Sequence, residues 1–456
     1  MRYVQREISG WGRFPRRVCR LYRPERSSTL KALIQSSREE SWIGRGLGRS
    51  YGDAALNSDQ GVILCERLDR LLGFDPDSGR LHCEAGVSLG EILDFFLPRG
   101  WFLPVTPGTR FVTVAGAVAA DIHGKNHHRD GALSRHLEQI ELWTADGQSL
   151  ICSPQEQRDV FEATAGGMGL TGFIRSAVLR LIPVETAWMR VSYRRTSNLD
   201  ETLQALQEAD RQHYSVAWLD MLADGRSLGR GIVMGGEHAR IDQLNSPQRR
   251  HPLSPPAKRQ LPVPFNLPGL LLNRYSVGLF NSFYYRRAPS QPTTKLVDIN
   301  RYFYPLDALQ DWNRLYGKRG FLQYQCLFPP QQSRQGLTEV IQRFRQAGHA
   351  SFLTVLKRFG EEAGPLSFPQ PGHTLSLDVA HTGRKLLDFL EEIDQLVLEM
   401  GGRVYLAKDA RLSPQSFRQM YPRYPEWLQV KRRLDPENRF SSDLSRRLQI
   451  GQEVQP

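Results

Sequence analysis

The sequence lacks an apolar run that approaches the ~18 residues of a membrane-spanning helix. Residues 1–14 are polar and no apolar segment follows Arg16-Arg17, so neither a secretory nor a twin-arginine signal is expected. The five cysteines are scattered and form no CxxC pair, which argues against a disulfide framework or a zinc site. We therefore expect a cytoplasmic protein, at most peripheral to the inner face of the plasma membrane.

Acidic residues are in the minority, with 48 Asp and Glu against 60 Lys and Arg and a net charge of +12. Such an excess favours an anionic partner: nucleic acid, an acidic membrane surface or a phosphorylated substrate. No nucleic-acid-binding module is recognisable and the arginines are dispersed, so no nucleic acid is expected as a partner. The 456 residues suit two or three domains.

Strand-like runs and helical patterns alternate along the chain. Residues 81–87 read as a strand, and a capping box, Ser88-x-x-Glu91, predicts a helix that ends at Gly100. Further strands are predicted at 215–221 and 322–328, a helix at 385–400, and a helix start at Ser413-Pro414. This mixture indicates the α+β class.

One segment, residues 245–268, holds seven prolines and predicts a mobile loop rather than a packed element. With the residues up to 272 it joins a basic cluster to an apolar set, which suggests peripheral contact with an anionic membrane. The alternative is a loop that touches nothing. The basic residues are Arg249, Arg250, Lys258 and Arg259, and the apolar ones are Leu261, Val263, Phe265, Leu267, Leu270, Leu271 and Leu272.

Three glycine-rich segments stand out. In the first, GRGLGRSYGD at 44–53, alternate glycines let backbone N–H groups converge on an anion, although a tight surface turn would look the same. It is not a Rossmann fingerprint, because no helix-forming run follows. The second covers 107–128 and the third, GGMGLTG, covers 166–172. One long ligand that contains a pyrophosphate would explain all three.

The histidines of the second segment allow two interpretations. His123, His127 and His128 could suggest a metal site, but Gly124 intervenes and carboxylate partners are missing, so no metal is expected. The alternative for His123 is an interior histidine with satisfied hydrogen bonds.

The segments GRGLGRSYGDAALN, PGTRFVTVAGAVAADIHGKNHH and GGMGLTGFI resemble the FAD-binding signatures of the vanillyl-alcohol-oxidase (PCMH-type) flavoprotein superfamily. Within it, nearly the whole chain is similar, in the same order, to the decaprenylphosphoryl-β-D-ribose 2-oxidase family. The resemblance implies a two-domain PCMH-type FAD-binding fold. Its FAD-binding domain would span 1–186, completed by 403–456, and an inserted α+β substrate domain would span 187–402.

The resemblance also implies which residues hold FAD, many of them through the backbone. No histidine occurs in 44–53, so FAD is expected to be non-covalent. The implied cofactor-binding residues are Arg45, Gly46, Leu47, Gly48, Arg49, Ser50, Tyr51, Gly52, Asp53, Gly108, Thr113, Val114, Ala115, Gly116, Ala120, Asp121, Ile122, His123, Ile174 and Tyr405.

On the substrate side, the resemblance implies that Lys408, with His123 beside it, is catalytic. Lysines are usually solvated on the surface, and that is the alternative for Lys408 and Lys357. Ser376 stands where the relatives have Cys, which could alter the sugar or lipid accepted. The implied substrate-binding residues are Lys357, Gln325, Trp218, Tyr51 and Ser376.

The expected activity is FAD-dependent oxidation of a sugar secondary alcohol, the 2-hydroxyl of a polyprenylphosphoryl ribose. A short-chain reductase would complete the epimerisation to arabinose, as in cell-wall polysaccharide biosynthesis. Two alternatives stay open: an aldonolactone or alditol oxidase that acts on a soluble sugar, and a flavin-fold scaffold without turnover.

Overall fold

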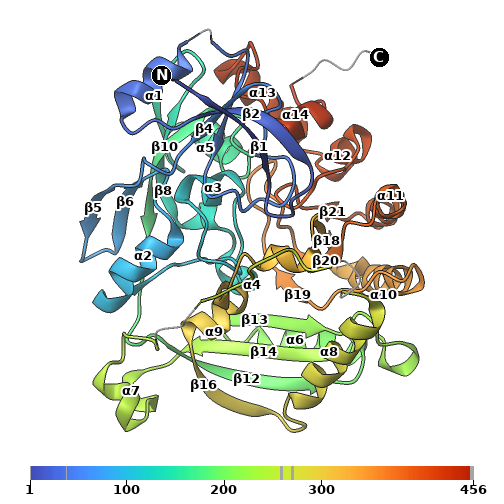
Figure 1. Ribbon diagram of the computed structural model, residues 1–456. Helices are drawn as coiled ribbons and strands as arrows, with labels where there is room; N and C mark the ends of the chain where they lie inside the picture. Colours follow the sequence, from blue (N-terminus) through green and yellow to red (C-terminus); the bar gives the residue numbers. More distant parts are fainter. Residues whose placement is uncertain (1, 37, 257–259, 269–271, 452–456) are drawn as a thin grey trace.

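The structure is a computed structural model that describes residues 2–36, 38–256, 260–268 and 272–451. In Figure 1 the N-terminal strands and the C-terminal helices lie together in the upper part of the molecule. The strands of residues 188–298 lie in the lower part, so the chain leaves the upper part once and returns to it.

Two small sheets form the upper part. In the first, β2, β4 and β3 run parallel; the order is β1 (Val4–Ser9), β2 (Arg16–Tyr22), β4 (Gly61–Leu64), β3 (Trp42–Arg45). The second is antiparallel, in the order β5 (Leu71–Asp75), β6 (Arg80–Glu84), β10 (Phe173–Arg180), β8 (Leu137–Trp143), β9 (Ser149–Cys152). A short pair, β7 (Trp101–Phe102) and β11 (Ile182–Pro183), adjoins them. The helices of this part are α1 (Ser27–Ile34), α2 (Leu89–Phe96), α3 (Val114–Ala119), α4 (His127–Asp130) and α5 (Arg158–Thr164).

Helix α2 begins at the capping box that the sequence predicts. Ser88 Oγ accepts a hydrogen bond from Glu91 N, and the Glu91 carboxylate accepts one from Ser88 N at 2.7 Å. A 3-10 turn, Leu97–Arg99, extends it to Gly100, whose φ of 83° lies in the left-handed region that favours glycine. The predicted start and end of this helix are therefore confirmed.

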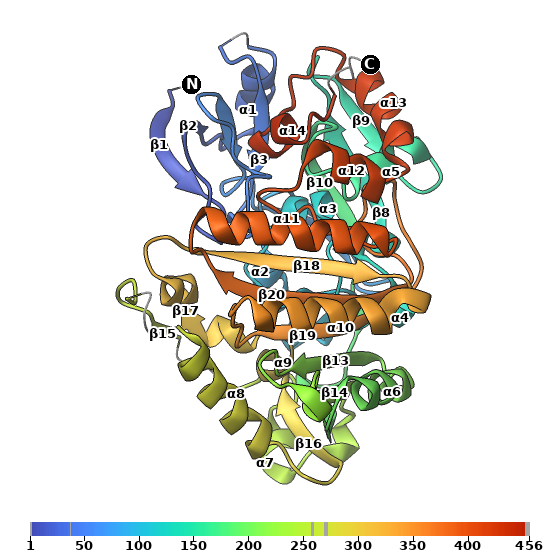
Figure 2. The same cartoon turned by 90° about the vertical axis from the view of Figure 1, so that its right-hand side faces the viewer.

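A large antiparallel sheet dominates the rest. Over the described residues its order is β16 (Thr293–Asp298), β12 (Trp188–Thr196), β14 (Gly231–His238), β13 (Tyr214–Leu219), β19 (Thr354–Phe359), β20 (Gly372–Ala380), β18 (Phe321–Phe328), β21 (Arg403–Val404). Every residue of β13 and β18 is buried, as expected for strands covered on both faces. Figure 2 shows the helices α10 (Pro330–Gln346) and α11 (Arg384–Glu399) beside β18 and β20. The α+β class is thus confirmed, while the exact domain boundaries stay predictions.

Smaller elements complete the lower part: α6 (Leu199–Ala209), α7 (Ser246–Arg250), α8 (Arg274–Arg287), α9 (Ile299–Phe303) and the parallel pair β15 (Leu261–Pro262) and β17 (Leu309–Gln310).

The C-terminal segment packs against the N-terminal sheet. Trp42 N donates to Arg439 O at 2.6 Å and Ser441 N donates to Trp42 O at 3.0 Å. These bonds pair the backbone at Phe440 with β3 in a parallel bridge. Trp427 Nε1 donates to Ala163 O at 2.8 Å. The helices of this segment are α12 (Pro414–Met420), which starts at Ser413-Pro414 as predicted, α13 (Tyr424–Leu434) and α14 (Asp443–Arg447).

The segment 245–268, predicted as a mobile loop, contains two short regular elements within its described residues, neither of which has a buried residue, and its mobility stays a prediction. Residues 246–250 form α7, with the Asn245 side chain as N-cap, and β15 pairs with β17. Arg314 Nη1 donates to the carbonyls of Val263 and Pro264 at 3.1 Å each, so side chains from a distant segment fix the proline-rich backbone. Lys258, Arg259, Leu270 and Leu271 lie outside the described residues.

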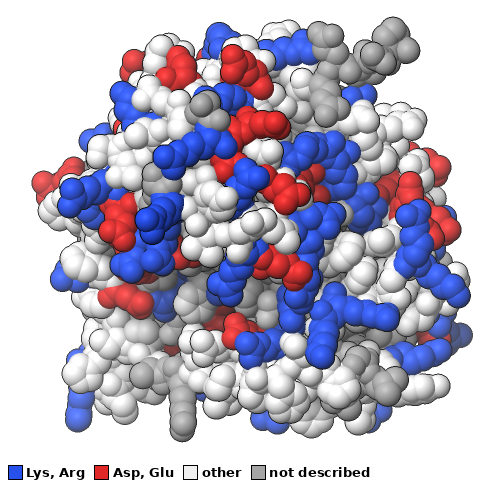
Figure 3. Space-filling view, turned by 45° about the horizontal axis from the view of Figure 1, so that its top comes forward, with Lys and Arg blue, Asp and Glu red and all other residues white. Residues whose placement is uncertain are grey.

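Charges of both signs mix on the face that Figure 3 shows, where Lys and Arg lie beside Asp and Glu over much of the surface. Among the described residues, no helix is long and apolar enough to cross a membrane.

Candidate functional site

A cavity of about 380 Å³ opens where the glycine-rich segments of the upper part face strands of the large sheet. Most of the residues that the sequence singled out line it, so the segment 44–53 is more than a surface turn. These are Gly46, Leu47, Gly48, Arg49, Ser50, Tyr51, Gly108, Thr113, Ala115, Gly116, Ala120, Ile122, His123, Ile174, Trp218, Gln325, Lys357, Ser376, Tyr405 and Lys408.

Five of the predicted cofactor residues do not line the cavity and support its wall from behind: Arg45, Gly52, Asp53, Val114 and Asp121. The Arg45 guanidinium donates to the carbonyls of Ser9 and Ala55, and Val114 belongs to the hydrophobic core. The Asp121 carboxylate accepts hydrogen bonds from Ser134 and Ser367. Gly52 packs so closely that a Cβ there would lie 1.8 Å from Asp409 O.

The glycines of the wall leave room for a ligand. A Cβ on Gly46 would come within 2.1 Å of Thr113 Oγ1, so only glycine lets the first loop approach the start of α3. Gly108 has no atom within 4 Å of the place where its Cβ would stand. Thr113 caps α3, and the N–H groups of this helix start, like those of the glycine loops, can hold an anion.

Lys408 lies at the centre of the site, and its Nζ stands 4.0 Å from the centre of the Tyr51 ring. Loss of contact with water lowers its pKa to about 7; the charge of Lys357 lowers it as well, while that of Asp378 raises it. A lysine with this pKa can exchange a proton near neutral pH.

Asp378 of β20 is fully buried close to Lys408. Burial raises its pKa to about 7, opposed by a hydrogen bond from Gln323 and by the charge of Lys408. Gln323 Nε2 donates to Asp378 Oδ1 at 2.6 Å, and the same side chain also hydrogen bonds to Tyr51. Sequence reasoning missed both residues, because only the register of β18 against β20 places Gln323 opposite Asp378.

Two further lysines face the cavity. Lys357 of β19 has its pKa lowered to about 8 by the loss of water contact. Lys125, which sequence reasoning also missed although it lies in the motif HGKNHH, donates from Nζ to Tyr302 O; desolvation and the charge of Lys357 lower its pKa to about 7. All three lysines are partly exposed to the cavity, so the alternative of solvated outer-surface lysines does not hold for Lys357 and Lys408.

His123 is buried in the wall beside these lysines. Its Nε2 lies 3.0 Å from Gln325 Nε2, which also donates to Thr374 Oγ1 at 3.2 Å. If the amide donates, His123 carries its proton on Nδ1, which has no hydrogen-bond partner within the described residues. Burial and the neighbouring cations hold the pKa of His123 well below its ordinary value, so the ring is neutral. Among the described residues, no group of three or more His, Cys, Asp and Glu could hold a metal ion.

The remaining predicted residues close the site. Tyr405 OH donates to Ala120 O at 2.7 Å, which ties the segment after β21 to the end of α3. Trp218 Nε1 donates to Phe352 O at 3.0 Å, and its ring packs against Tyr284 of α8 at 4.8 Å. Ser376 of β20 also lines the cavity and pairs with Gln325 of β18 in the register of the two strands. The structure thus brings all five predicted substrate residues to one cavity, Tyr51 from the first glycine-rich segment and the other four from strands of the large sheet.

Comparison with known proteins agrees with this geometry. A family model described as "FAD binding domain" matches residues 20–153, and one described as "D-arabinono-1,4-lactone oxidase" matches residues 362–448. The decaprenylphosphoryl-beta-D-ribose oxidase of Mycolicibacterium smegmatis is 38% identical over 452 residues, which cover 98% of both chains. The chain belongs to this family of FAD-linked, PCMH-type oxidoreductases.

Other relatives share smaller parts of the oxidoreductase. An uncharacterized protein of Streptomyces coelicolor is 37% identical over 79% of this chain and all of its own. The D-arabinono-1,4-lactone oxidase of Yarrowia lipolytica is 24% identical over 38% of this chain and 34% of its own. The protein is therefore an FAD-dependent enzyme related to the decaprenylphosphoryl-ribose and arabinonolactone oxidases.

The residues present fit FAD. The glycine loops and the start of α3 offer backbone N–H groups for its pyrophosphate. Arg49 lines the same part of the cavity, and its buried Nε has no hydrogen-bond partner in the described part of the chain. Its guanidinium stacks 3.9 Å from the Trp11 ring, which leaves its remaining N–H groups available to an anion.

Proposed function

We propose that the enzyme oxidises the 2-hydroxyl of a polyprenylphosphoryl ribose to the ketone, with a short-chain reductase to complete the epimerisation. The observation that carries this proposal is the meeting of three lysines and His123 in the cavity that the glycine loops also line, in a chain 38% identical over 98% of its length to a decaprenylphosphoryl-ribose oxidase. Cations in a partly apolar cavity suit a substrate that is both phosphorylated and lipid-linked.

The protein contributes position and proton transfer. FAD, when bound, supplies the acceptor of the hydride that leaves the carbinol carbon. Lys408, in its neutral form, takes the hydroxyl proton on Nζ, and the alcohol becomes a ketone. We assign to His123, whose Nδ1 has no hydrogen-bond partner among the described residues, a hydrogen bond to the substrate. Lys357 and Lys125 are candidates to hold the phosphate.

This mechanism predicts a rising limb near pH 7 in the profile of kcat/KM, because Lys408 must lose its proton to act as a base. Asp378 raises the pKa of Lys408, so Asp378→Asn should move the limb to lower pH by about one unit. Lys357 lowers that pKa, so Lys357→Met should move the limb to higher pH.

The exposed Lys385 on α11 gives a matched control, since Lys385→Met removes a lysine far from the cavity and should leave the limb in place. If Asp378→Asn and Lys357→Met shift the limb in the same direction, the electrostatic argument is contradicted. Loss of the limb in Asp378→Asn, with activity at all pH values reduced, would make Asp378 the base instead of Lys408.

We also propose that FAD is held without a covalent bond, because residues 44–53 contain no histidine. Precipitation of the holoenzyme with acid should leave all the yellow colour in the supernatant. A flavin that stays with the washed precipitate after denaturation would contradict this expectation.

Anaerobic reduction of the bound flavin tests the function itself. A polyprenylphosphoryl ribose should bleach the flavin absorbance, whereas the arabinose epimer, free ribose and inorganic phosphate should bleach it weakly or not at all. Bleaching by free aldonolactones or alditols alone would favour the soluble-sugar oxidase, to which the family model at residues 362–448 gives some support. No bleaching by any of these sugars would favour a scaffold.

A further inference from the structure

Helix α8, residues Arg274–Arg287, has one face fixed to the protein. Val277 and Asn281 are buried one turn apart, and Asn281 Nδ2 donates to Asp220 Oδ1 at 2.9 Å. Near the C-terminal end, Tyr285 OH donates to Thr196 O at 3.0 Å. The helix is therefore held by polar contacts that do not depend on its outer face.

The outer face of α8 is apolar and exposed. Tyr275, Leu279 and Phe283 follow each other at intervals of four residues and so lie along one side of the helix; they are 79%, 75% and 59% exposed. Scattered apolar residues are normal on a protein surface, but a row of three large side chains is typical of an interaction site. Leu261 and Phe265, in the segment before α8, are exposed as well, and Figure 2 shows β15, which contains Leu261, near the start of α8.

The stretch of sequence that contains this row carries charge of one sign. Residues 243–297 contain eight Lys and Arg and no Asp or Glu, although about one residue in ten of the whole chain is acidic. Arg286 and Arg287 form the last turn of α8 and Arg274 its first, so basic side chains stand at both ends of the apolar row. An apolar row with basic ends is typical of helices that lie at the surface of an anionic membrane.

The same helix forms part of the cavity. Tyr284 lines the cavity and is also partly exposed, and its ring packs against Trp218 on one side and Phe280 on the other. Figure 1 shows α8 on the outside of the lower part, with one side toward the sheet and the other toward solvent. Phe283 of the exposed row precedes Tyr284 in the chain, so the row adjoins a residue of the cavity wall.

We propose that α8 docks the enzyme on an anionic lipid bilayer. Tyr275, Leu279 and Phe283 insert at the level of the headgroups, and Arg274, Arg286 and Arg287 contact lipid phosphates. The cavity then opens beside the membrane, so that a lipid-linked substrate can present its sugar while its chain stays in the bilayer. This last consequence rests on the proposed function; the docking itself does not.

Vesicle sedimentation of the holoenzyme tests the docking. Wild type should bind vesicles of phosphatidylglycerol and phosphatidylcholine in equal parts, and binding should weaken as salt is added. Leu279→Glu/Phe283→Glu should lower the bound fraction roughly tenfold or more, because it places two charges in the apolar row. Arg286→Gln/Arg287→Gln should weaken binding to these vesicles and leave any binding to pure phosphatidylcholine unchanged.

Leu71→Glu/Leu72→Glu is the matched control, because both leucines are 39% exposed on β5, in the upper part of the molecule, and the charge change is the same. It should bind vesicles as wild type does. Equal binding by the α8 variant and wild type, or no binding by wild type, would overturn the proposal. The proposal would also be overturned if the wild type is a dimer that does not bind vesicles and the α8 variant is a monomer. The apolar row would then bind a second copy of the chain.

Flavin bleaching in detergent, with the same lipid-linked sugar, separates this proposal from the proposed function. The α8 variant should bleach as fast as wild type in detergent and more slowly in vesicles. Vesicle binding without bleaching by wild type would contradict the proposed substrate and leave the docking supported.

Discussion

Lys408→Met is expected to lower kcat by about 10²-fold or more while FAD stays bound. The reason is the position of its amine, which faces the cavity 4.0 Å from the Tyr51 ring and has a pKa lowered to about 7. Methionine keeps the length and the apolar contacts of the stem and removes only the group that can take a proton. The check is a single-turnover rate of flavin bleaching, with the visible spectrum as a measure of bound FAD.

Lys408→Arg distinguishes a base from a fixed positive charge. Arginine stays protonated, so it can replace a charge that holds the substrate but cannot accept its proton. We expect the Arg variant to be as slow as the Met variant. A fast Arg variant would assign Lys408 an electrostatic role, and a fast Met variant would remove Lys408 from the mechanism.

Local sequence patterns were sufficient where one short segment determines the structure. The capping box at Ser88 fixes the start of α2 through contacts between residues three apart, and Ser413-Pro414 does the same for α12. The glycine loops could be predicted to face a ligand, because closely spaced glycines expose backbone N–H groups that can bind an anion. The identities of the substrate residues came from the family resemblance and not from local patterns.

The rest of the site depends on contacts between distant segments. Asp378 and Gln323 meet because β18 pairs with β20, and a one-residue slip in that register would turn Asp378 away from Gln323. Lys125 enters the cavity because Tyr302, far along the chain, supplies a carbonyl for its amine. The prolines of 245–268 predict a mobile loop, and nothing in the local sequence indicates that Arg314 binds the backbone carbonyls of Val263 and Pro264.

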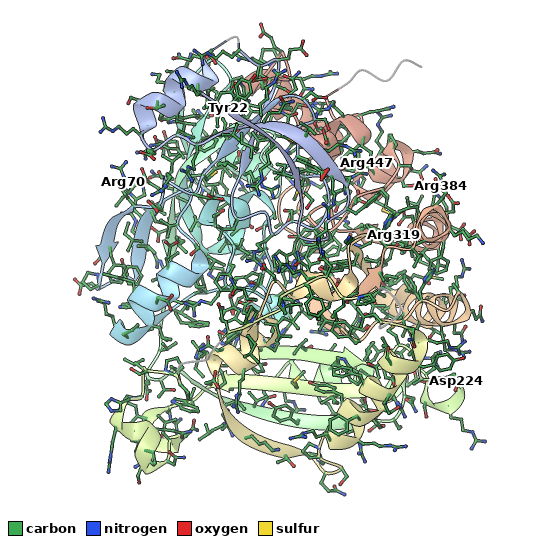
Figure 4. The ribbon with its side chains drawn as sticks, in the orientation of Figure 1. Tyr22, Arg70, Asp224, Arg319, Arg384 and Arg447 are labelled. Atoms are coloured by element: carbon green, nitrogen blue, oxygen red, sulfur yellow. The ribbon has the colours of Figure 1, made fainter. Side chains whose placement is uncertain are left out.

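Asp53 also depends on a contact with a distant segment that the local sequence does not show. Loss of this contact is expected to cause a large decrease in stability. The family resemblance implies that Asp53 is a cofactor residue, but its carboxylate pairs with Arg447 of α14, which Figure 4 labels. Nε and Nη2 of Arg447 lie 2.8 Å from Oδ2 and Oδ1 of Asp53. The same guanidinium lies 2.9 Å from Asp409 Oδ2, next to Lys408, and donates to Leu412 O. Arg447 thereby joins the end of the first glycine loop to the segment that carries Lys408.

Arg447→Met should destabilise the protein by about 3–5 kcal/mol, because it leaves two carboxylates, 4% and 1% exposed, without their cation. Thermal unfolding with FAD in excess measures the loss. Arg384→Met, which breaks an exposed pair with Asp388 on α11, is the control and should change stability by less than about 0.5 kcal/mol.

The pH dependence of this loss follows from the same pair of carboxylates. Burial already raises the pKa of Asp53, and Arg447 opposes this rise; Arg447 also helps to hold the pKa of Asp409 below its ordinary value. Loss of Arg447 raises both folded-state pKa values, so the penalty is largest above the raised values and shrinks as the pH falls through them. Adding Asp53→Asn to Arg447→Met removes one of the two unpaired charges and should restore part of the stability. Two results would contradict the idea that Arg447 stabilises the fold by pairing with buried carboxylates. One is a double variant no more stable than Arg447→Met; the other is a cost of less than about 1 kcal/mol for Arg447→Met.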